Sequence, residues 1–454
     1  MRKYFGTDGI RRIANSELTP ELVYKVAKAG AYVLSKHSNH TPTIFIGRDT
    51  RISGTLIEAA MTAGFLSYVA NVKRLGVIPT PGVAYLTKRF KADASVVISA
   101  SHNTFEFNGI KYFSNKGMKI PDTLEEEIEE VMDSGKIEEL TAMSDKIGVA
   151  EDRQDLLEEY VYFFRKNFEE DLENLDKENF VVAIDTANGA TSCVAEKVFT
   201  KLGIKHYIIN NHPDGININD KCGSTHMEGL QKFVVEHKCN LGIAYDGDGD
   251  RCLAVNEKGE LVDGDCIMAI ISNYLKEKGK LKKDTLVATV MSNLGLRKYA
   301  EDNGIHFEAT KVGDRYVLEN MLENGYNLGG EQSGHIILLD YNPTGDGILT
   351  SLMLIKILLE KKASVSKLCE IIKIYPQVLI NAKVSADKKY DYEKDPEIKA
   401  RIDELEKEFS GNGRVLIRPS GTEPLVRVMI EGENQEYIKE KAESLAKFIE
   451  QKLK

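Results

Sequence analysis

Disulfide frameworks, cysteine metal sites and membrane spans all find little support in this sequence. Its 454 residues include six cysteines, and no two of them form a C-x-x-C pair. Isolated thiols in a large chain are typical of reduced core residues, so we expect a cytoplasmic location. The most apolar stretch begins at Ile348, contains Lys356 and is too short to span a bilayer. The N-terminus has no apolar signal segment, so we expect neither a signal peptide nor a membrane partner.

An excess of positive charge is also missing. Lysine and arginine total 60 against 70 aspartates and glutamates, which gives a net charge of −10. Nucleic acids and anionic membranes need a broad cationic surface, so we expect neither as a partner. A small anionic substrate needs only a few local arginines and stays open. No Walker A, H-E-x-x-H or G-x-G-x-x-G motif occurs, so nucleotide and zinc chemistry have no support.

What the chain does contain is a regular alternation of short β-branched runs and amphipathic segments. At about 150 residues per domain, its length predicts about three domains. One helix is predicted over Thr19–Leu34, with Thr19 as N-cap and Pro20 at the first position. Nearly continuous apolar runs predict buried parallel strands and an α/β architecture. These runs are Thr43–Gly47, Ser95–Ile98, Phe180–Ile184, Leu241–Tyr245 and Leu286–Val290.

The pattern changes after about residue 371. Strands are predicted at Val378–Val384, Arg414–Ile417 and Leu425–Ile430, and helices at Ile398–Phe409 and Glu436–Lys452. This order favours a two-layer α+β unit at the C-terminus. Two highly charged stretches, Glu125–Lys136 and Glu151–Glu173, are predicted as solvated helix faces and a connector.

Two polar loops that follow predicted strands could carry chemistry, since ligands in α/β sheets bind beyond the carboxyl ends of strands. The first is S-A-S-H-N at 99–103, whose second serine is either an activated nucleophile or part of an ordinary turn. The second is D-G-D-G-D-R at 246–251, where three carboxylates alternate with glycines and suit Mg²⁺. A plain surface turn and a calcium EF-hand are the alternatives. The EF-hand is disfavoured because Arg251 occupies the position that requires glycine and the flanks are strand-like.

Two later loops have polar groups of a different kind. G-G-E-Q-S-G-H-I at 329–336 presents Glu331 and Ser333, which suit sugar hydroxyls, unless the segment is only a glycine-rich turn. R-P-S-G-T-E-P-L-V-R at 418–427 could bind phosphate between two arginines, and the alternative is a β-hairpin turn. We expect His335 to be structural. A serine, a divalent site, a polyol site and a phosphate site together indicate phosphoryl transfer.

In this order, the four loops resemble those of the α-D-phosphohexomutase superfamily, and the match spans the chain. The opening F-G-T-D-G-I-R, the E-Q-S-G-H loop and the length are most similar to bacterial members that act on glucosamine phosphates. The resemblance implies three related α/β domains with mixed sheets and a smaller C-terminal two-layer α+β domain around a central active-site cleft. The implied domains are a phosphoserine domain (1–152), a metal-binding domain (153–256), a sugar-binding domain (257–370) and a phosphate-binding domain (371–454).

The resemblance also implies roles for single residues. Ser101 would carry the phosphoryl group, and Mg²⁺ would bind Asp246, Asp248, Asp250 and the phosphorylated Ser101. Further catalytic residues would be His102, Lys111 and Arg251. Sugar hydroxyls would contact Glu331 and Ser333, and the unreacting phosphate would contact Arg418, Ser420, Gly421, Thr422 and Arg427. Thr7, Arg11 and Arg48 are expected in the cleft. Thr104 departs from the family pattern, which has proline there.

The implied reaction interconverts glucosamine 6-phosphate and glucosamine 1-phosphate through a phosphoserine enzyme and glucosamine 1,6-bisphosphate. A sugar bisphosphate would act as primer, and the product would feed UDP-N-acetylglucosamine and cell-wall precursor synthesis. The alternatives are a phosphoglucomutase or phosphomannomutase, which Gln332 disfavours, and a non-catalytic sugar-phosphate binding protein. The expected partner is a phosphosugar, and a homodimer is left open.

Overall fold

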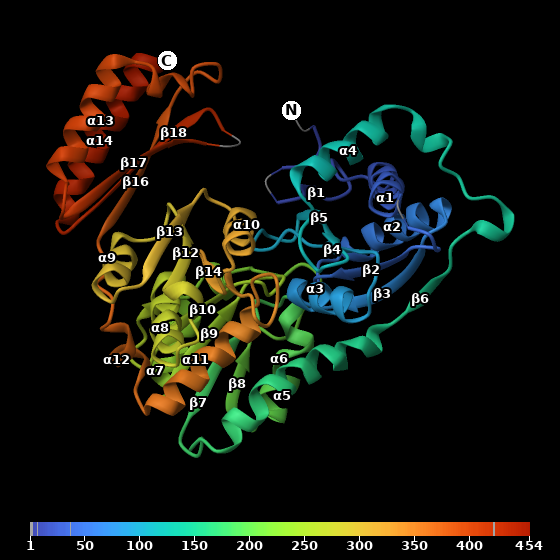
Figure 1. Cartoon of the computed structure of the whole chain (residues 1–454), viewed down its shortest axis with the longest axis horizontal. Helices are drawn as coiled ribbons and strands as arrows, with labels where there is room; N and C mark the ends of the chain where they lie inside the picture. Colours follow the sequence, from blue (N-terminus) through green and yellow to red (C-terminus); the bar gives the residue numbers. More distant parts are fainter. Residues whose placement is uncertain (1–2, 7, 37, 421–422) are drawn as a thin grey trace. The chain divides into compact units, whose positions relative to one another are not determined.

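The computed structural model describes residues 3–6, 8–36, 38–420 and 423–454. The chain forms two compact units: Met1–Val290 with His306–Glu370, and Met291–Ile305 with Ile371–Lys454. The polypeptide therefore passes between the units three times, and Figure 1 labels the elements of both. Among the described residues, no helix combines the length and the apolar character that crossing a bilayer requires.

The first sheet of the first unit has the strand order β1-β5-β4-β2-β3-β6. Strands β4, β2, β3 and β6 run parallel, whereas β5 pairs antiparallel with both β4 and β1. Its strands are β1 (Ile10–Ile13), β2 (Thr43–Arg48), β3 (Asn71–Val77), β4 (Ala94–Ile98), β5 (Phe107–Ser114) and β6 (Ala150–Asp152). Its helices are α1 (Pro20–Ser35), α2 (Gly54–Tyr68), α3 (Thr80–Arg89) and α4 (Asp122–Asp133).

The second and third sheets of this unit are also mixed, with orders β11-β10-β9-β7-β8 and β13-β12-β14-β15. The second contains β7 (Val181–Asp185), β8 (Lys205–Ile209), β9 (Leu241–Tyr245), β10 (Cys252–Asn256) and β11 (Leu261–Val262), with α5 (Leu157–Glu173), α6 (Ala195–Lys201) and α7 (Glu228–Glu236). The third contains β12 (Thr285–Thr289), β13 (His306–Thr310), β14 (Leu328–Gly330) and β15 (Ile336–Leu338), with α8 (Gly264–Glu277), α10 (Asp314–Asn324), α11 (Gly347–Lys361) and α12 (Val365–Cys369).

The second unit is built on a three-stranded antiparallel sheet with the order β16-β18-β17. Its elements are β16 (Gln377–Lys383), β17 (Gly413–Pro419), β18 (Leu425–Gly432), α9 (Leu294–Asp302), α13 (Pro396–Glu408) and α14 (Gln435–Leu453). Helices α13 and α14 cover one face of the sheet and enclose a core that includes Ile398, Val428, Ile438 and Leu445 (Figure 1). The predicted fold class, three α/β domains with mixed sheets and a smaller α+β domain, is confirmed.

The local predictions hold because they rest on strong short-range signals. Every residue of β4, β9 and β12 is buried, as expected for apolar runs covered on both faces. The Thr19 hydroxyl accepts a hydrogen bond from the Leu22 amide and caps α1, with Pro20 as the first helical residue.

The charged stretch Glu151–Glu173 is only partly the solvated connector that we expected. The acidic side chains of Glu169 and Glu170 are exposed on α5. The opposite face of this helix buries Tyr160, Phe164 and Phe168 in the core. The predicted solvated helix face is therefore present on α5, and the aromatic residues at helical spacing form the buried face that packs against the core.

Candidate active site

The loop after β4 and the loop after β9 meet inside the first unit. The Ser101 hydroxyl donates a hydrogen bond to Asp246 Oδ2 at 2.7 Å, and both residues are buried. They lie 145 positions apart in the sequence. Ser101 has φ +51°, a left-handed conformation that is uncommon for a residue with a side chain. The loop that presents this serine must therefore be held by its surroundings.

That support comes mainly from Arg51, whose side chain is fully buried. Its Nη2 donates to the carbonyl oxygens of Ser101 at 3.0 Å and Asn103 at 2.8 Å. Its Nη1 donates to the carbonyl oxygens of Phe107 at 3.0 Å and Thr104. Arg51 was not among the predicted site residues, although it lies three positions after Arg48, which was expected in the cleft.

The second anchor is a carboxylate. Asp49 Oδ2 accepts from Arg51 Nε at 2.8 Å and from the Ser99 hydroxyl at 2.6 Å. The Ser99 hydroxyl in turn accepts from the Ser101 amide at 2.9 Å. Arg48 lies elsewhere, with its Nε 3.4 Å from Glu58 on α2.

Asp246, Asp248 and Asp250 form a buried carboxylate cluster. One oxygen from each lies within 4.8 Å of the others, a spacing that could hold a metal ion. Within the part of the chain that the structure describes, Asp248 Oδ1 and Asp250 Oδ1 are buried without a hydrogen-bond partner. Burial, with Asp250 and Asp248 nearby, raises the pKa of Asp246. Unpaired buried carboxylate oxygens fit a hard divalent cation such as Mg²⁺.

Lys111 lies against this cluster, only 2% exposed, with its Nζ 3.1 Å from Asp248 Oδ2 and 3.1 Å from Asp8 Oδ2. Burial alone would lower the pKa of Lys111, but the two carboxylates outweigh it and raise that pKa. Lys111 therefore stays an ammonium, and it in turn holds the pKa of Asp248 below its usual value despite burial.

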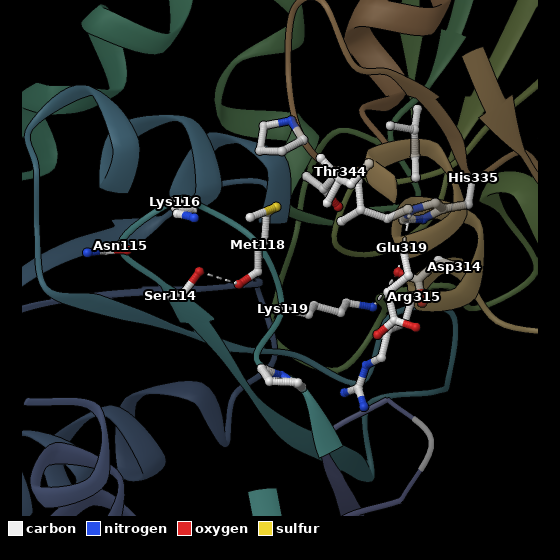
Figure 2. Close-up of a pocket in the computed structure, with 15 residues that line it drawn as sticks. Ser114, Asn115, Lys116, Met118, Lys119, Asp314, Arg315, Glu319, His335 and Thr344 are labelled. Atoms are coloured by element: carbon white, nitrogen blue, oxygen red, sulfur yellow. Dashed lines mark hydrogen bonds and ion pairs between the residues drawn. The ribbon is translucent and has the colours of Figure 1, made fainter. Parts of the chain in front are cut away.

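A second lysine extends the network toward α10. Lys119 Nζ lies 2.5 Å from Asp8 Oδ1 and 2.6 Å from Asp314 Oδ2. Figure 2 shows Lys119 reaching from the segment after β5 to Asp314 at the start of α10. None of the three was predicted as a site residue: Asp8 lies in the quoted F-G-T-D-G-I-R motif, whereas nothing in the sequence marks Lys119 or Asp314.

His335 lies beside both Asp250 of the carboxylate cluster and Asp314. Its Nε2 accepts a hydrogen bond from the Gly345 amide at 3.0 Å, so the ring hydrogen is on Nδ1, which lies 3.5 Å from Asp250 Oδ2. Together with Lys119 and Asp314, it lines a cavity of about 300 Å³ (Figure 2). The apolar part of the lining includes Met118, Leu318, Leu322 and Ile337. An apolar environment strengthens the attraction between the charges beside it.

His102 and Arg251 lie on the serine side of the cluster. His102 Nδ1 is 3.4 Å from the Ser101 hydroxyl and 3.2 Å from Arg251 Nη1. Burial and the Arg251 charge lower the pKa of His102 to about 4, so the imidazole is neutral at pH 7 and accepts a hydrogen bond from Arg251. The Arg251 amide donates to Asp246 Oδ1 at 3.1 Å.

Arg11 also belongs to this group, because its guanidinium donates to Asn103 Oδ1 and Asp8 Oδ2, each at 2.9 Å. Of the predicted cleft residues, Arg11 therefore contacts the site. Arg48 pairs with α2, and Thr7 lies outside the described residues.

The predicted sugar loop lies between β14 and β15. It is fastened next to Arg251, because the Cys252 amide donates to the Gly334 carbonyl at 3.0 Å. Burial raises the pKa of Glu331, whose carboxylate accepts from the Gly313 amide at 3.1 Å. Within the described ranges, the Ser333 hydroxyl is buried without a hydrogen-bond partner, so it is available to a polar ligand.

The predicted phosphate loop belongs to the second unit and forms the β17–β18 hairpin. Arg418 and Arg427 lie directly opposite each other in this hairpin, so the hairpin alternative describes the backbone, and phosphate binding by the two arginines stays a prediction. Burial, together with Arg427, lowers the pKa of Arg418. The Ser420 hydroxyl accepts from the Glu423 amide at 3.2 Å. Gly421 and Thr422 lie outside the described residues.

The four domain models of phosphoglucomutase/phosphomannomutase match this chain. The alpha/beta/alpha domains I, II and III match residues 2–139, 158–259 and 263–375, and the C-terminal domain matches residues 379–448. The chain therefore belongs to the phosphoglucomutase/phosphomannomutase family, and it is a phosphohexomutase, an isomerase. The predicted membership of the α-D-phosphohexomutase superfamily is confirmed.

Individual proteins and solved structures are also similar to this chain. The proteins named phosphoglucosamine mutase from Ruminiclostridium cellulolyticum and Acetivibrio thermocellus are each 54% identical to this chain, and each alignment covers 100% of both chains. A phosphoglucomutase/phosphomannomutase family protein from Burkholderia thailandensis has a similar solved structure, with a TM-score of 0.79 at 20% identity over 98% of this chain and 97% of that one. Another is Aspergillus fumigatus N-acetylphosphoglucosamine mutase in complex with GlcNAc-6P and magnesium, with a TM-score of 0.73 at 16% identity over 99% and 96%.

Proposed function

We propose that this chain interconverts glucosamine 6-phosphate and glucosamine 1-phosphate, with Ser101 as the phosphoryl carrier. The observation that carries the proposal is the buried contact of Ser101 Oγ with Asp246 at 2.7 Å, inside an aspartate cluster suited to a metal. A serine beside a cation site is what phosphoryl transfer needs, whereas simple binding of a sugar phosphate needs neither. The full-length similarity to proteins named phosphoglucosamine mutase supports the amino-sugar substrate.

In the proposed reaction, phosphorylated Ser101 gives its phosphoryl group to the free O1 of glucosamine 6-phosphate. The P–O bond to Ser101 breaks as the bond to O1 forms, and the proton that O1 loses is taken up overall by the departing Ser101 oxygen, which yields glucosamine 1,6-bisphosphate and a free Ser101 hydroxyl. This intermediate turns end for end and returns its other phosphoryl group to Ser101, so the enzyme is regenerated. A trace of sugar bisphosphate would prime an enzyme that has lost its phosphate.

Mg²⁺ would be held by Asp246, Asp248, Asp250 and an oxygen of phosphorylated Ser101, and it would supply positive charge to the transferring group. Lys111 and Arg251 would stabilise charge on the equatorial phosphoryl oxygens. His102, which accepts from Arg251, would keep that guanidinium in place. The magnesium in the Aspergillus fumigatus complex supports this choice of metal.

Glu331 and Ser333 would bind sugar hydroxyls, and the phosphate that does not react would bind Arg418, Ser420, Gly421, Thr422 and Arg427. Gln332 was the residue expected to favour an amino sugar. Its side-chain amide donates to Asp263 Oδ2, the N-cap of α8, at 3.0 Å. It therefore supports the loop from behind, so the amino-sugar preference rests on the relatives rather than on this side chain.

The test is turnover of glucosamine, glucose and mannose phosphates by the purified protein, with trace sugar bisphosphate as primer. Glucosamine phosphate should be the best substrate. If glucose or mannose phosphate is turned over faster, the chain is a phosphoglucomutase or phosphomannomutase instead, which the family description equally covers.

Two perturbations test the site itself. Ser101→Ala should abolish turnover and leave the protein folded, whereas Ser134→Ala, at an exposed serine at the end of α4, should leave turnover unchanged. Removal of divalent cations by a chelator should stop the reaction, and added Mg²⁺ should restore it. An active S101A variant or a chelator-resistant enzyme would contradict the assignment.

The remaining sequence predictions stay predictions. They are the domain bounds 1–152, 153–256, 257–370 and 371–454, the homodimer, the cytoplasmic location, the absence of nucleic-acid partners and the supply of product to UDP-N-acetylglucosamine synthesis.

A further inference from the structure

Two cysteines that are 103 positions apart in the sequence are in contact in the first unit. Cys266 lies in the first turn of α8, and Cys369 is the last residue of α12. Their sulfur atoms are 2.9 Å apart, and both residues are free thiols. A disulfide bond is about 2.05 Å long, so bond formation requires an approach of about 0.9 Å.

The two thiols differ in their surroundings. Cys266 is 4% exposed, whereas Cys369 is half-buried. The hydrogen bond to Cys369, together with burial, raises the pKa of the Cys266 thiol. An oxidant in water therefore reaches Cys369 first, and Cys266 is the resolving thiol next to it.

Cys369 lies beside a passage between the two units, and Cys266 lies beside a residue that supports the predicted sugar loop. The second unit resumes at Ile371, directly after α12, so Cys369 sits at one of the three passages between the units. The other end of α12 is already fastened, because the Ser366 amide donates to Glu257 at 3.2 Å. Cys266 lies next to Asp263, the N-cap of α8 that also accepts from the sugar-loop residue Gln332.

We propose that Cys266 and Cys369 form a reversible disulfide when the protein meets a peroxide, and that this bond restrains the junction and slows turnover. The Cys369 thiolate attacks the peroxide, which forms a sulfenic acid and releases hydroxide. The Cys266 sulfur then attacks the Cys369 sulfur, and the leaving hydroxyl departs with the thiol proton as water. A thiol reductant reverses the bond. Formation of the bond is independent of the proposed function, whereas the loss of turnover rests on it.

The experiment uses the full chain, treated with hydrogen peroxide and then alkylated. Peptide mass spectrometry should find the peptides of Cys266 and Cys369 joined and lacking two hydrogen atoms. Turnover should fall several-fold and recover with dithiothreitol. Cys369→Ser should start at normal turnover and lose the peroxide sensitivity. Cys193→Ser, at another half-buried cysteine, should remain sensitive.

Each outcome decides the proposal. Absence of the joined peptide in the wild-type protein overturns it, and so does equal inhibition of C369S. A joined peptide without loss of turnover overturns the regulatory effect. The activity arm uses whichever hexose phosphate the reduced enzyme turns over best. Failure with glucosamine phosphate alone would therefore count against the proposed function and not against the disulfide.

Discussion

Replacement of Arg51 by lysine distinguishes the contribution of its positive charge from that of its guanidinium geometry. The buried guanidinium donates to carbonyl oxygens of the serine loop, among them those of Ser101 and Asn103, and to Asp49 Oδ2. A lysine has the same charge, but its donors project from a single nitrogen atom and cannot span acceptors that lie apart. We therefore expect Arg51→Lys to keep the pair with Asp49 and to lose the support of the loop.

The size of the effect follows from these contacts. The carbonyl oxygens of Ser101 and Asn103 keep a hydrogen bond from Asn219 Nδ2, each at 2.9 Å, so they lose one donor without being left unpaired. A net hydrogen bond contributes about 0.5–1.5 kcal/mol, so the loss of two should lower the free energy of unfolding by about 1–3 kcal/mol. Ser101, at φ +51°, would then relax toward a more favourable conformation. A displacement of the reacting oxygen by about 1 Å lowers turnover by about 100-fold.

The measurement combines urea unfolding with steady-state kinetics on the primed enzyme. We expect kcat to fall and KM to change little, because the loop positions the reacting group in the transition state and adds no uniform binding. The matched control is Arg74→Lys, at an arginine whose pair with Asp152 is solvent-exposed. There stability should change by about 0.5 kcal/mol or less. A less stable R51K enzyme with wild-type kcat below its unfolding transition would refute the positioning role.

Three further predictions follow from single contacts. Lys111→Met leaves the buried carboxylate of Asp248 without its cation, whereas Asp8 keeps Lys119 and Arg11, so urea unfolding should show a loss of about 3–5 kcal/mol and assays a fall in kcat of about 10²–10³-fold; near-normal values for both would contradict the pairing. Thr104→Pro introduces the residue that the family pattern has at this position. Within the described chain the Thr104 amide donates no hydrogen bond, so we expect unchanged turnover and a gain of about 0.4–1 kcal/mol in unfolding free energy. Destabilisation would show that the backbone angle at residue 104 is incompatible with proline. Burial raises the pKa of Asp346 to about 6, so the folded state holds this proton more tightly than the unfolded chain. The free energy of unfolding should therefore fall by about 3 kcal/mol as the pH rises from about 4 to about 6. Urea unfolding of Asp346→Asn across this range should lack this fall, and the same pH dependence as in the wild-type protein would count against the prediction.

The serine and aspartate loops could be predicted from the sequence because each carries its own local signal. S-A-S-H-N and D-G-D-G-D-R both follow apolar runs that could only be buried strands, β4 and β9. Loops at the carboxyl ends of such strands are the usual place for ligands, so their proximity was expected before any coordinates. The 2.7 Å contact between Ser101 and Asp246 agrees with that expectation.

The rest of the site depends on contacts that no local pattern records. Lys119 and Asp314 are 195 positions apart, and each alone is an ordinary charged residue. Arg48 ends β2 and Arg51 lies in the loop that follows, and only the direction of the chain after β2 decides which of them reaches the serine loop. The cysteines were predicted as isolated thiols, and the packing of α12 on α8 brings Cys266 and Cys369 together.

The charged groups of the site have different partners, and these partners indicate different roles for Lys111 and the three aspartates. Lys111 is paired with Asp248 and Asp8, and within the described residues neither Asp246 nor Asp250 forms an ion pair with a lysine. Asp246 accepts the Ser101 hydroxyl hydrogen, a donor that exists only while Ser101 carries no phosphoryl group. In the proposed reaction, phosphorylation of Ser101 would remove this donor and add about two negative charges beside the carboxylates, which a divalent cation, together with Lys111 and Arg251, would stabilise. Phosphorylation of Ser101 and binding of the cation would therefore favour each other.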